Sequence, residues 1–223
     1  MKNVLEVDSI QKYVNKNFSL SDIYLRCGTG DVLGIFGRNG SGKSMLLKII
    51  FGKENADNKF IRINNQLFKT AYKKPDTIVY LPQNSFLPKN LSVKKILNLY
   101  FDRETVAAIL EDEFLETMYL SKISELSGGE LRYLELKLLL KSTAKFVLLD
   151  EPLNALLPIL REKIIRLIAI EKASKGIIIT DHDFSNLSSI TTQNYLMNNG
   201  TLKKITGVED LVLWNYLPTS YTL

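Results

Sequence analysis

The fold is decided by one glycine-rich stretch, Gly37-Arg38-Asn39-Gly40-Ser41-Gly42-Lys43-Ser44. It fits the pattern G-x-x-x-x-G-K-[ST], in which glycines let backbone N–H groups point at phosphate oxygens. An apolar run, Val32–Phe36, precedes the stretch, and a helical pattern follows from Met45. The loop therefore lies between a strand and a helix, whose N-terminus adds partial positive charge. We expect Lys43 to reach the β- and γ-phosphates of a nucleotide and Ser44 to join a Mg²⁺ shell.

The rest of the chain predicts an α/β core. Ile78–Leu81 is a further short apolar strand. Two more apolar runs have the composition of strands covered on both faces in a parallel sheet: Phe146–Leu149 and Ile177–Ile179. A helical period over 158–172 joins the last two runs into a βαβ unit. Between 92 and 141 the period is again helical, so we expect a mostly helical insertion.

Composition limits the class of protein. The chain has 223 residues, 45% hydrophobic and 24% charged, an ordinary globular balance. We find no apolar stretch near the roughly 18 residues that a membrane helix needs. A single cysteine, Cys27, fits a reducing compartment, and we expect a cytoplasmic protein. The net charge of +5 fits solvated lysines or an anionic membrane surface. Without a run of like charges we expect no nucleic-acid partner.

A second glycine motif, Leu126-Ser127-Gly128-Gly129-Glu130, directly precedes a predicted helix. Small residues at a helix N-terminus make an anion site. Ser127 is also a good N-cap, so a plain helix cap is the alternative interpretation.

Polar residues follow three of the predicted strands. Asp150 and Glu151 end one apolar run, where one carboxylate can hold a water of a Mg²⁺ shell and the other can activate water. Two solvated acids are the alternative. His182, the only histidine, and Gln83 follow two other strands at the edge where parallel sheets bind ligands. Alone, each is a weak signal.

Taken in order along the chain, these motifs resemble the ATP-binding cassette (ABC) ATPases. The resemblance implies one domain over 1–223, with a P-loop NTPase (RecA-like) core, a mostly parallel sheet, an N-terminal antiparallel β subdomain and a short helical subdomain at roughly 84–141. It implies ATP and Mg²⁺ as ligands. It makes Glu151, His182, Gln83 and Lys43 the catalytic residues and Ser44, Gln83 and Asp150 the metal-binding residues.

The same resemblance implies how the nucleotide is enclosed. An aromatic residue upstream of the lysine stacks on adenine, and Tyr13 is the best placed, with Tyr24 and Phe18 as less favoured competitors. Two cassettes, identical or closely homologous, meet head to tail. The Ser127-Gly128-Gly129 loop of one then closes over the nucleotide on the phosphate loop of the other.

Three positions depart from the family pattern. Glu130 stands where the family most often has glutamine, and Met45 replaces a threonine that can touch an α-phosphate. Leu157 stands where the family has an aspartate that crosses the dimer interface, so communication between the two sites is in question. The segment between Gln83 and Ser127 is also short.

The resulting hypothesis is the ATP-hydrolysing subunit of an ABC-type transporter, peripheral on the cytoplasmic face and driving a separate membrane permease. Four residues are candidates to line a groove for that permease, with core packing as an equal alternative: Phe86, Leu87, Pro88 and Leu91. Two further hypotheses stay open: a soluble single-cassette ATPase in assembly or regulation, and a module that binds ATP but hydrolyses it weakly.

Overall fold

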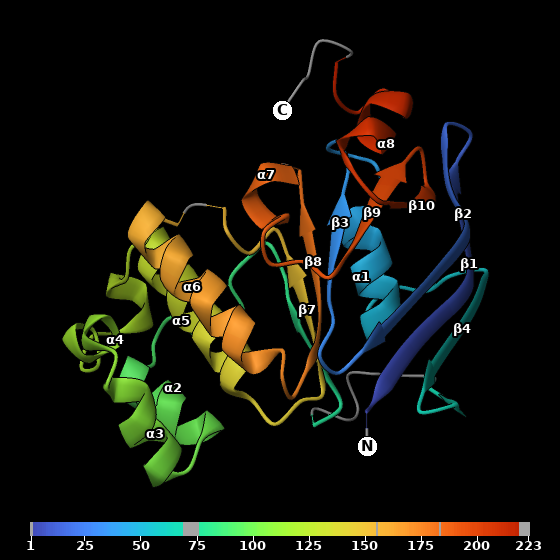
Figure 1. Ribbon diagram of the computed structural model, residues 1–223. Coiled ribbons are helices and arrows are strands. Elements are labelled where there is room, and N and C mark those ends of the chain that lie inside the picture. The colour runs from blue at the N-terminus through green and yellow to red at the C-terminus, as the bar shows by residue number, and fades with distance from the viewer. Residues whose placement is uncertain (1, 69–75, 155, 183, 219–223) are drawn as a thin grey trace.

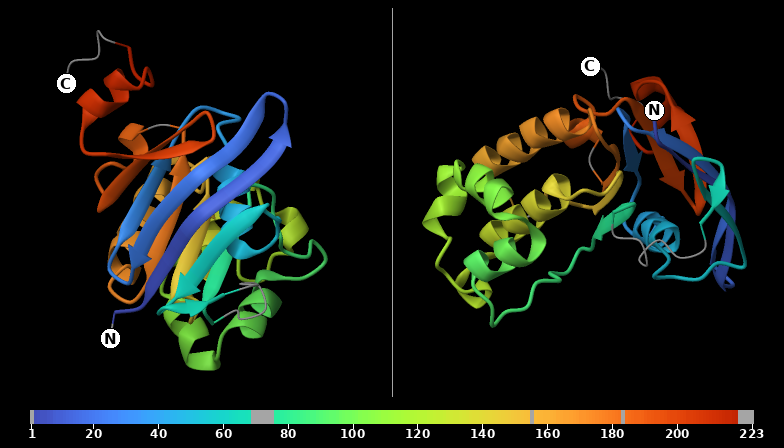
Figure 2. Two further views of the ribbon diagram at one scale, coloured as in Figure 1. Left: turned by 90° about the vertical axis from the view of Figure 1, so that its right-hand side faces the viewer. Right: turned by 90° about the horizontal axis from the view of Figure 1, so that it is seen from below.

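The computed structural model describes residues 2–68, 76–154, 156–182 and 184–218. Two sheets enclose the helix α1 (Lys43–Phe51), as the right-hand view of Figure 2 shows. The smaller sheet is antiparallel and has the order β2-β1-β4-β5. Its strands are β1 (Val4–Asn15), β2 (Phe18–Gly28), β4 (Asn58–Ile63) and β5 (Gln66–Leu67). The expected N-terminal antiparallel sheet is therefore confirmed, and it includes β4 and β5 from beyond α1.

The larger sheet has the order β10-β9-β3-β8-β7-β6. Its strands are β3 (Val32–Phe36), β6 (Ile78–Leu81), β7 (Phe146–Asp150), β8 (Gly176–Asp181), β9 (Gln193–Asn198) and β10 (Thr201–Ile205). All neighbours pair in parallel except β9 and β10, which form a hairpin. The mostly parallel sheet predicted from the apolar runs is confirmed.

Helices cover the other face of the large sheet, where α5 and α6 lie side by side in Figures 1 and 2. The short helices α2 to α4 lie beyond them, away from the antiparallel sheet (Figure 1). The bounds on this side are α2 (Val93–Tyr100), α3 (Arg103–Leu110), α4 (Glu113–Thr117), a 3₁₀ turn (Ile123–Glu125), α5 (Gly128–Lys141) and α6 (Pro158–Glu171). Two more short helices flank the β9–β10 hairpin in the chain: α7 (Phe184–Leu187) before it and α8 (Val208–Leu213) after it. Helical period thus predicted the segment 92–141 correctly.

Two apolar clusters hold these layers together, one on each face of the large sheet. The first joins α1 to both sheets, and its fully buried members include Leu5, Leu46 and Ile178. The second joins the opposite face of the large sheet to α5 and α6 and extends into α2 to α4. Because strands β7 and β8 are buried on both faces, each carries a continuous apolar run, Phe146–Leu149 and Ile177–Ile179, rather than an alternating pattern.

One partly buried carboxylate joins the helices α4, α5 and α6. Asp112, the N-cap of α4, accepts hydrogen bonds from the Tyr133 hydroxyl at 2.5 Å and the Lys137 ammonium at 2.7 Å, both on α5. Lys163 on α6 donates a third at 2.9 Å. Partial burial acts to raise the pKa of Asp112, but these hydrogen bonds outweigh it and hold that pKa well below its usual range.

Within the described ranges, none of the helices combines the length and the apolar character needed to cross a bilayer.

Candidate nucleotide-binding site

Four parallel strands bring the predicted site residues to one edge of the large sheet. Phe36 is the register partner of Asp181, and Asp150 is the register partner of Thr180, so β3, β7 and β8 end level with one another. Strand β6 ends beside β7 at the same edge. The site residues that follow these strand ends are Gly37, Glu151, His182 and Gln83.

The phosphate loop has the backbone that its glycines predict. Gly40 and Gly42 have φ of 80° and 110°, in the left-handed region that favours glycine. A Cβ on Gly42, the N-cap of α1, would lie 2.6 Å from the Leu20 side chain. The Ser41 hydroxyl oxygen is buried and has no hydrogen-bond partner among the described residues. An orphaned polar atom beside a helix N-terminus fits a phosphate oxygen as its missing partner.

Lys43 lies folded into this loop and is only 4% exposed. Its ammonium donates to the Gly37 carbonyl at 2.7 Å and the Arg38 carbonyl at 3.2 Å. The Glu151 carboxylate lies 3.9 Å away. Burial lowers the pKa of Lys43, opposed by the nearby carboxylates. The ammonium thus lies inside the phosphate loop, with two backbone carbonyls of that loop as its partners.

The predicted metal-binding residues meet at one hydroxyl. Ser44 donates to Oδ1 of Asp150 at 2.9 Å and accepts from the Gln83 amide at 3.1 Å. Within the described ranges no three His, Cys, Asp or Glu residues cluster as metal ligands. Magnesium in nucleotide sites takes one or two protein carboxylates and fills its octahedron with phosphate oxygens and water. The set of one carboxylate, one hydroxyl and one amide fits that ion.

Two residues that sequence reasoning missed hold Asp150 in place. The Tyr80 hydroxyl donates to Oδ2 of Asp150 at 3.0 Å, and the Thr180 hydroxyl donates to Oδ1 at 2.9 Å. Both are buried. The signal available in the sequence was a polar atom inside each of two otherwise apolar strands.

Glu151 has a strained backbone, with φ of 47°. Its N–H donates to the Thr180 hydroxyl at 3.1 Å, and the Asn154 amide donates to its Oε2 at 2.8 Å. Glu151, Lys43 and Gln83 line one cavity of about 510 Å³ beside the phosphate loop. The structure therefore brings Glu151, which follows an apolar strand, into the same cavity as Lys43.

His182 lies at the sheet edge but is not among the residues that line this cavity. Its imidazole is about half exposed, with Nδ1 3.5 Å from the buried Asp181 carboxylate. Its backbone carbonyl accepts a hydrogen bond from the Tyr216 hydroxyl.

The three aromatic candidates for adenine lie on the β1–β2 hairpin. Phe18 lines the cavity at the phosphate loop. Tyr13 lies near the same end of the hairpin with its side chain 64% exposed, and it lines an adjoining hollow together with Phe18. Tyr24 lies farther along β2, and its hydroxyl donates to Glu6 at 3.3 Å. Phe18, which was a less favoured candidate than Tyr13, is thus the aromatic residue that lines the cavity at the phosphate loop.

The second glycine motif forms the start of α5. Ser127 and Glu130 make a reciprocal capping box, with the Glu130 N–H donating to the Ser127 hydroxyl at 3.3 Å and the Ser127 N–H donating to Glu130 Oε2 at 2.7 Å. The helix-cap interpretation therefore holds within this chain. Ser127, Gly128 and Gly129 do not line the cavity at their own phosphate loop.

The other two departures from the family pattern lie in different surroundings. Met45 lines the cavity at the phosphate loop and packs against the core. Leu157 is 63% exposed immediately before Pro158, the first residue of α6.

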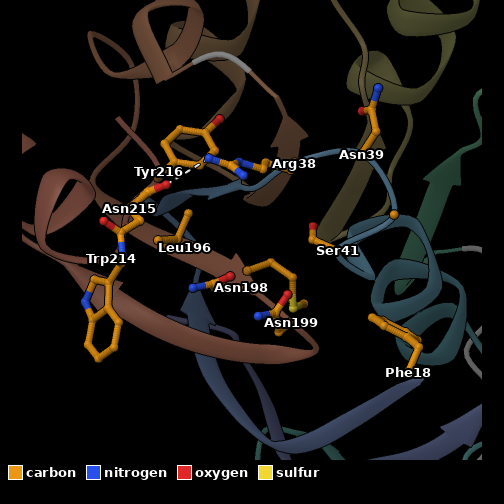
Figure 3. A pocket seen from close by; sticks show the side chains of 12 residues that line it. Phe18, Arg38, Asn39, Ser41, Leu196, Asn198, Asn199, Trp214, Asn215 and Tyr216 are labelled. Carbon is orange, nitrogen blue, oxygen red and sulfur yellow. Dashed lines mark hydrogen bonds between the residues drawn. The ribbon is translucent and has the colours of Figure 1, made fainter. Parts of the chain in front are cut away.

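The C-terminal segment packs against the phosphate loop, which sequence reasoning did not foresee. Figure 3 shows Arg38 reaching toward Asn215 and Tyr216, and its guanidinium donates to the Asn215 carbonyl at 2.9 Å. These residues and Trp214 line a second cavity of about 410 Å³ beside Ser41. The Lys203 ammonium lies 4.0 Å from the centre of the Trp214 ring.

The site combines four features of a P-loop NTPase. These are the phosphate loop, a carboxylate and an amide that bond to the loop serine, and a second carboxylate near the loop lysine.

Comparison with known proteins agrees. The ABC transporter family matches residues 20–154. The chain is 30% identical over 197 residues to the lipopolysaccharide export system ATP-binding protein LptB of Escherichia coli K12, covering 82% of each chain. It is 26% identical over 223 residues to LptB of Haemophilus influenzae, covering 90% of this chain and 89% of that one.

Solved structures give the same result. The ATP-binding cassette MJ1267 of an ABC transporter aligns with a TM-score of 0.75 and 28% identity over 95% of both chains. A nucleotide-free cassette from an ABC transporter aligns with a TM-score of 0.77 and 26% identity, over 97% of this chain and 96% of that one. This chain belongs to the ABC transporter family and is an ATP-binding cassette ATPase of it.

Proposed function

We propose that the protein hydrolyses MgATP between two cassettes that meet head to tail, and that this cycle drives a separate membrane permease. The observation that carries the proposal is the convergence of Lys43, Ser44, Gln83, Asp150 and Glu151 at one sheet edge. The helices of 84–141 are the protein's proposed helical subdomain.

Each residue at the edge has a proposed role in hydrolysis. Lys43 and the loop N–H groups bind the β- and γ-phosphates, and Ser44, Asp150 and Gln83 hold Mg²⁺, which neutralises phosphate charge. The Glu151 carboxylate, near the phosphate position, orients and deprotonates the attacking water. His182 approaches the γ-phosphate only after its half-exposed imidazole turns toward the loop. Tyr13 or Phe18 stacks on adenine.

Head-to-tail pairing is supported by the exposure of the second glycine motif. Ser127 is exposed, and a Cβ built on Gly128 meets no atom within 4 Å. The N-terminus of α5 therefore offers an open anion site that its own phosphate loop does not fill. We propose that a second copy, or a close homologue, supplies the nucleotide for this site.

The proposed permease site is a hollow beside Gln83. It measures about 390 Å³, and its lining includes Asn84, Ser85, Leu131 and Glu135. Of the four residues first considered for this groove, Leu87 is 6% exposed and belongs to the core. Phe86 and Leu91 are partly buried against the same cluster, which supports the packing alternative for them. Binding at this hollow would place the protein on the cytoplasmic face of a membrane.

A weakly hydrolysing ATP-binding module is the second candidate, and the exposed Leu157 favours it. An apolar side chain at this position offers no carboxylate to a partner cassette. The two candidates are separated by phosphate release from wild type and from Glu151→Gln, measured under identical MgATP. Turnover that falls about 100-fold or more in Glu151→Gln supports the active enzyme. Equal rates in both proteins overturn it.

The permease is tested by purification from membranes of cells expressing the tagged chain. Co-purification with a multi-span membrane protein, lost in Leu131→Glu but kept in the exposed-site control Leu157→Glu, supports the proposal. Recovery of wild type only as a soluble species favours the soluble single-cassette alternative.

A further inference from the structure

Arg132 is a buried cation one turn into α5, the helix that begins with the second glycine motif. Its side chain is 8% exposed, and burial lowers its pKa, opposed by Glu135 and Asp150. A buried guanidinium is costly unless each side of its fork finds a partner. The partners of Arg132 are therefore informative about what it does.

The guanidinium spans two of the catalytic segments. One terminal nitrogen donates to the Pro82 carbonyl at 2.6 Å, directly before Gln83. The other donates to the Asp150 carbonyl at 2.7 Å and to the Glu151 carbonyl at 3.3 Å. Arg132 thus holds the backbone on both sides of the site and touches neither reacting side chain.

Glu135, one turn farther along α5, completes the arrangement. Its carboxylate lies 3.6 Å from the Arg132 guanidinium and accepts the Phe86 N–H at 3.0 Å. Glu135 is 1% exposed, so this ion pair is shielded from water. The pair fixes the strand-to-helix segment 82–86 at two points against the same face of α5.

We propose that Arg132 is a positioning residue that sets the backbone of Gln83 and Glu151 according to the position of the Ser127–Gly129 loop on its own helix. This inference rests on the proposed function. A nucleotide contacted by Ser127 pulls on the N-terminus of α5, and the rigid planar fork one turn away carries that displacement to Pro82 and to Glu151. Each chain thereby senses, through α5, the nucleotide held by its partner.

Such a link acts within one chain, so it does not need the interface aspartate that Leu157 replaces. The distances from Arg132 to the three carbonyls are those of direct hydrogen bonds, with no mobile loop between them. The geometry requires arginine in particular. A lysine ammonium has no planar fork and cannot reach Pro82 and Asp150 carbonyls with two parallel donors.

The test compares Arg132→Lys with Tyr133→Phe, a change at the next residue on α5. Tyr133 is also buried, and its substitution removes one hydrogen bond to Asp112. Should Arg132→Lys fold poorly, the double variant Arg132→Met with Glu135→Gln leaves no unpaired buried charge. For each protein we measure kcat, the Kd for MgATP, the melting temperature, and amide exchange of peptides covering 82–86 and 150–154.

We expect Arg132→Lys to lower kcat by about 10- to 100-fold, the effect of misplacing a catalytic group by about 1 Å, while the Kd for MgATP changes less than about twofold. Amide exchange should quicken in both peptides. Tyr133→Phe should lower the melting temperature and leave kcat and exchange in both peptides near wild type.

Unchanged kcat and exchange in the Arg132 variants overturn the link. The link is also overturned if Tyr133→Phe loses as much kcat and stability as the Arg132 variants, because that result indicates a purely structural effect of α5. Failure of the proposed function gives a different result, because the wild-type protein then shows no more turnover than Glu151→Gln. In that case amide exchange alone decides whether Arg132 holds the two segments.

Discussion

The Tyr80 hydroxyl donates a 3.0 Å hydrogen bond to Oδ2 of Asp150. Burial raises the pKa of Tyr80, and the Asp150 charge raises it further, so the phenol stays protonated and remains a donor at neutral pH. With Oδ2 occupied, Oδ1 is the oxygen that faces Ser44. The orientation of Asp150, the carboxylate proposed to bind Mg²⁺, is therefore fixed from inside the sheet.

Tyr80→Phe should weaken Mg²⁺ binding in the nucleotide complex by about tenfold, because losing an outer partner of a metal-binding carboxylate typically costs this much. Hydrolysis measured against Mg²⁺ concentration gives the half-saturation value. The control is Tyr195→Phe, another buried tyrosine of the same sheet, whose hydroxyl bonds to Gln193 instead. An unchanged half-saturation value for Tyr80→Phe would show that Asp150 needs no such support.

Lys43→Ala should weaken ATP binding by about tenfold or more, because a charge-assisted bond to phosphate contributes about 1.5–3 kcal/mol. Equilibrium titration with a fluorescent ATP analogue measures the effect. Lys53→Ala, just beyond α1, controls for loss of one positive charge. Unaltered affinity in Lys43→Ala would mean that the phosphate loop is misassigned.

Asp112→Asn should lower the free energy of unfolding by about 2 kcal/mol at pH 7, because it leaves Lys137 and Lys163 without their shared counter-charge. Denaturant unfolding measures it. Asp102→Asn, which keeps a good N-cap on α3, should leave the free energy of unfolding nearly unchanged.

The pH dependence of this difference follows from the lowered pKa of Asp112. A carboxylate with a depressed folded-state pKa stabilises the fold above its ordinary pKa and loses that contribution as pH falls toward the folded-state value. The gap between wild type and Asp112→Asn should therefore be constant above about pH 5 and narrow below about pH 4. A gap that widens on acidification would contradict the assignment.

The sequence predicted those parts of the fold and site whose signal is local. Apolar runs give buried strands, and Gly37 to Ser44 give the loop, because each depends on neighbouring residues only. The partners of Tyr80 and Thr180 depend on strand register, which the sequence does not reveal. Arg132 looks like an ordinary charge on a helix until α5 is placed against β7. Contacts such as Arg38 with Asn215 join residues too far apart in the chain for any local pattern.

Glu151→Gln should convert the protein into an ATP-dependent dimer, because nucleotide still bridges two copies while water is no longer activated. Sedimentation velocity in MgATP should show a species of twice the monomer mass that dissociates when ATP is removed. A variant that remains monomeric in saturating MgATP would oppose head-to-tail pairing.

The most direct measurement adds Gly128→Asp to Glu151→Gln and repeats the sedimentation in MgATP. Gly128 has open space around it, and an aspartate at a helix N-terminus is well tolerated, so the monomer should fold and bind ATP normally. Its carboxylate would repel a triphosphate held by the partner. The account predicts that the dimer disappears while the Kd for ATP stays unchanged. A dimer that forms equally well with Asp at position 128 would contradict it.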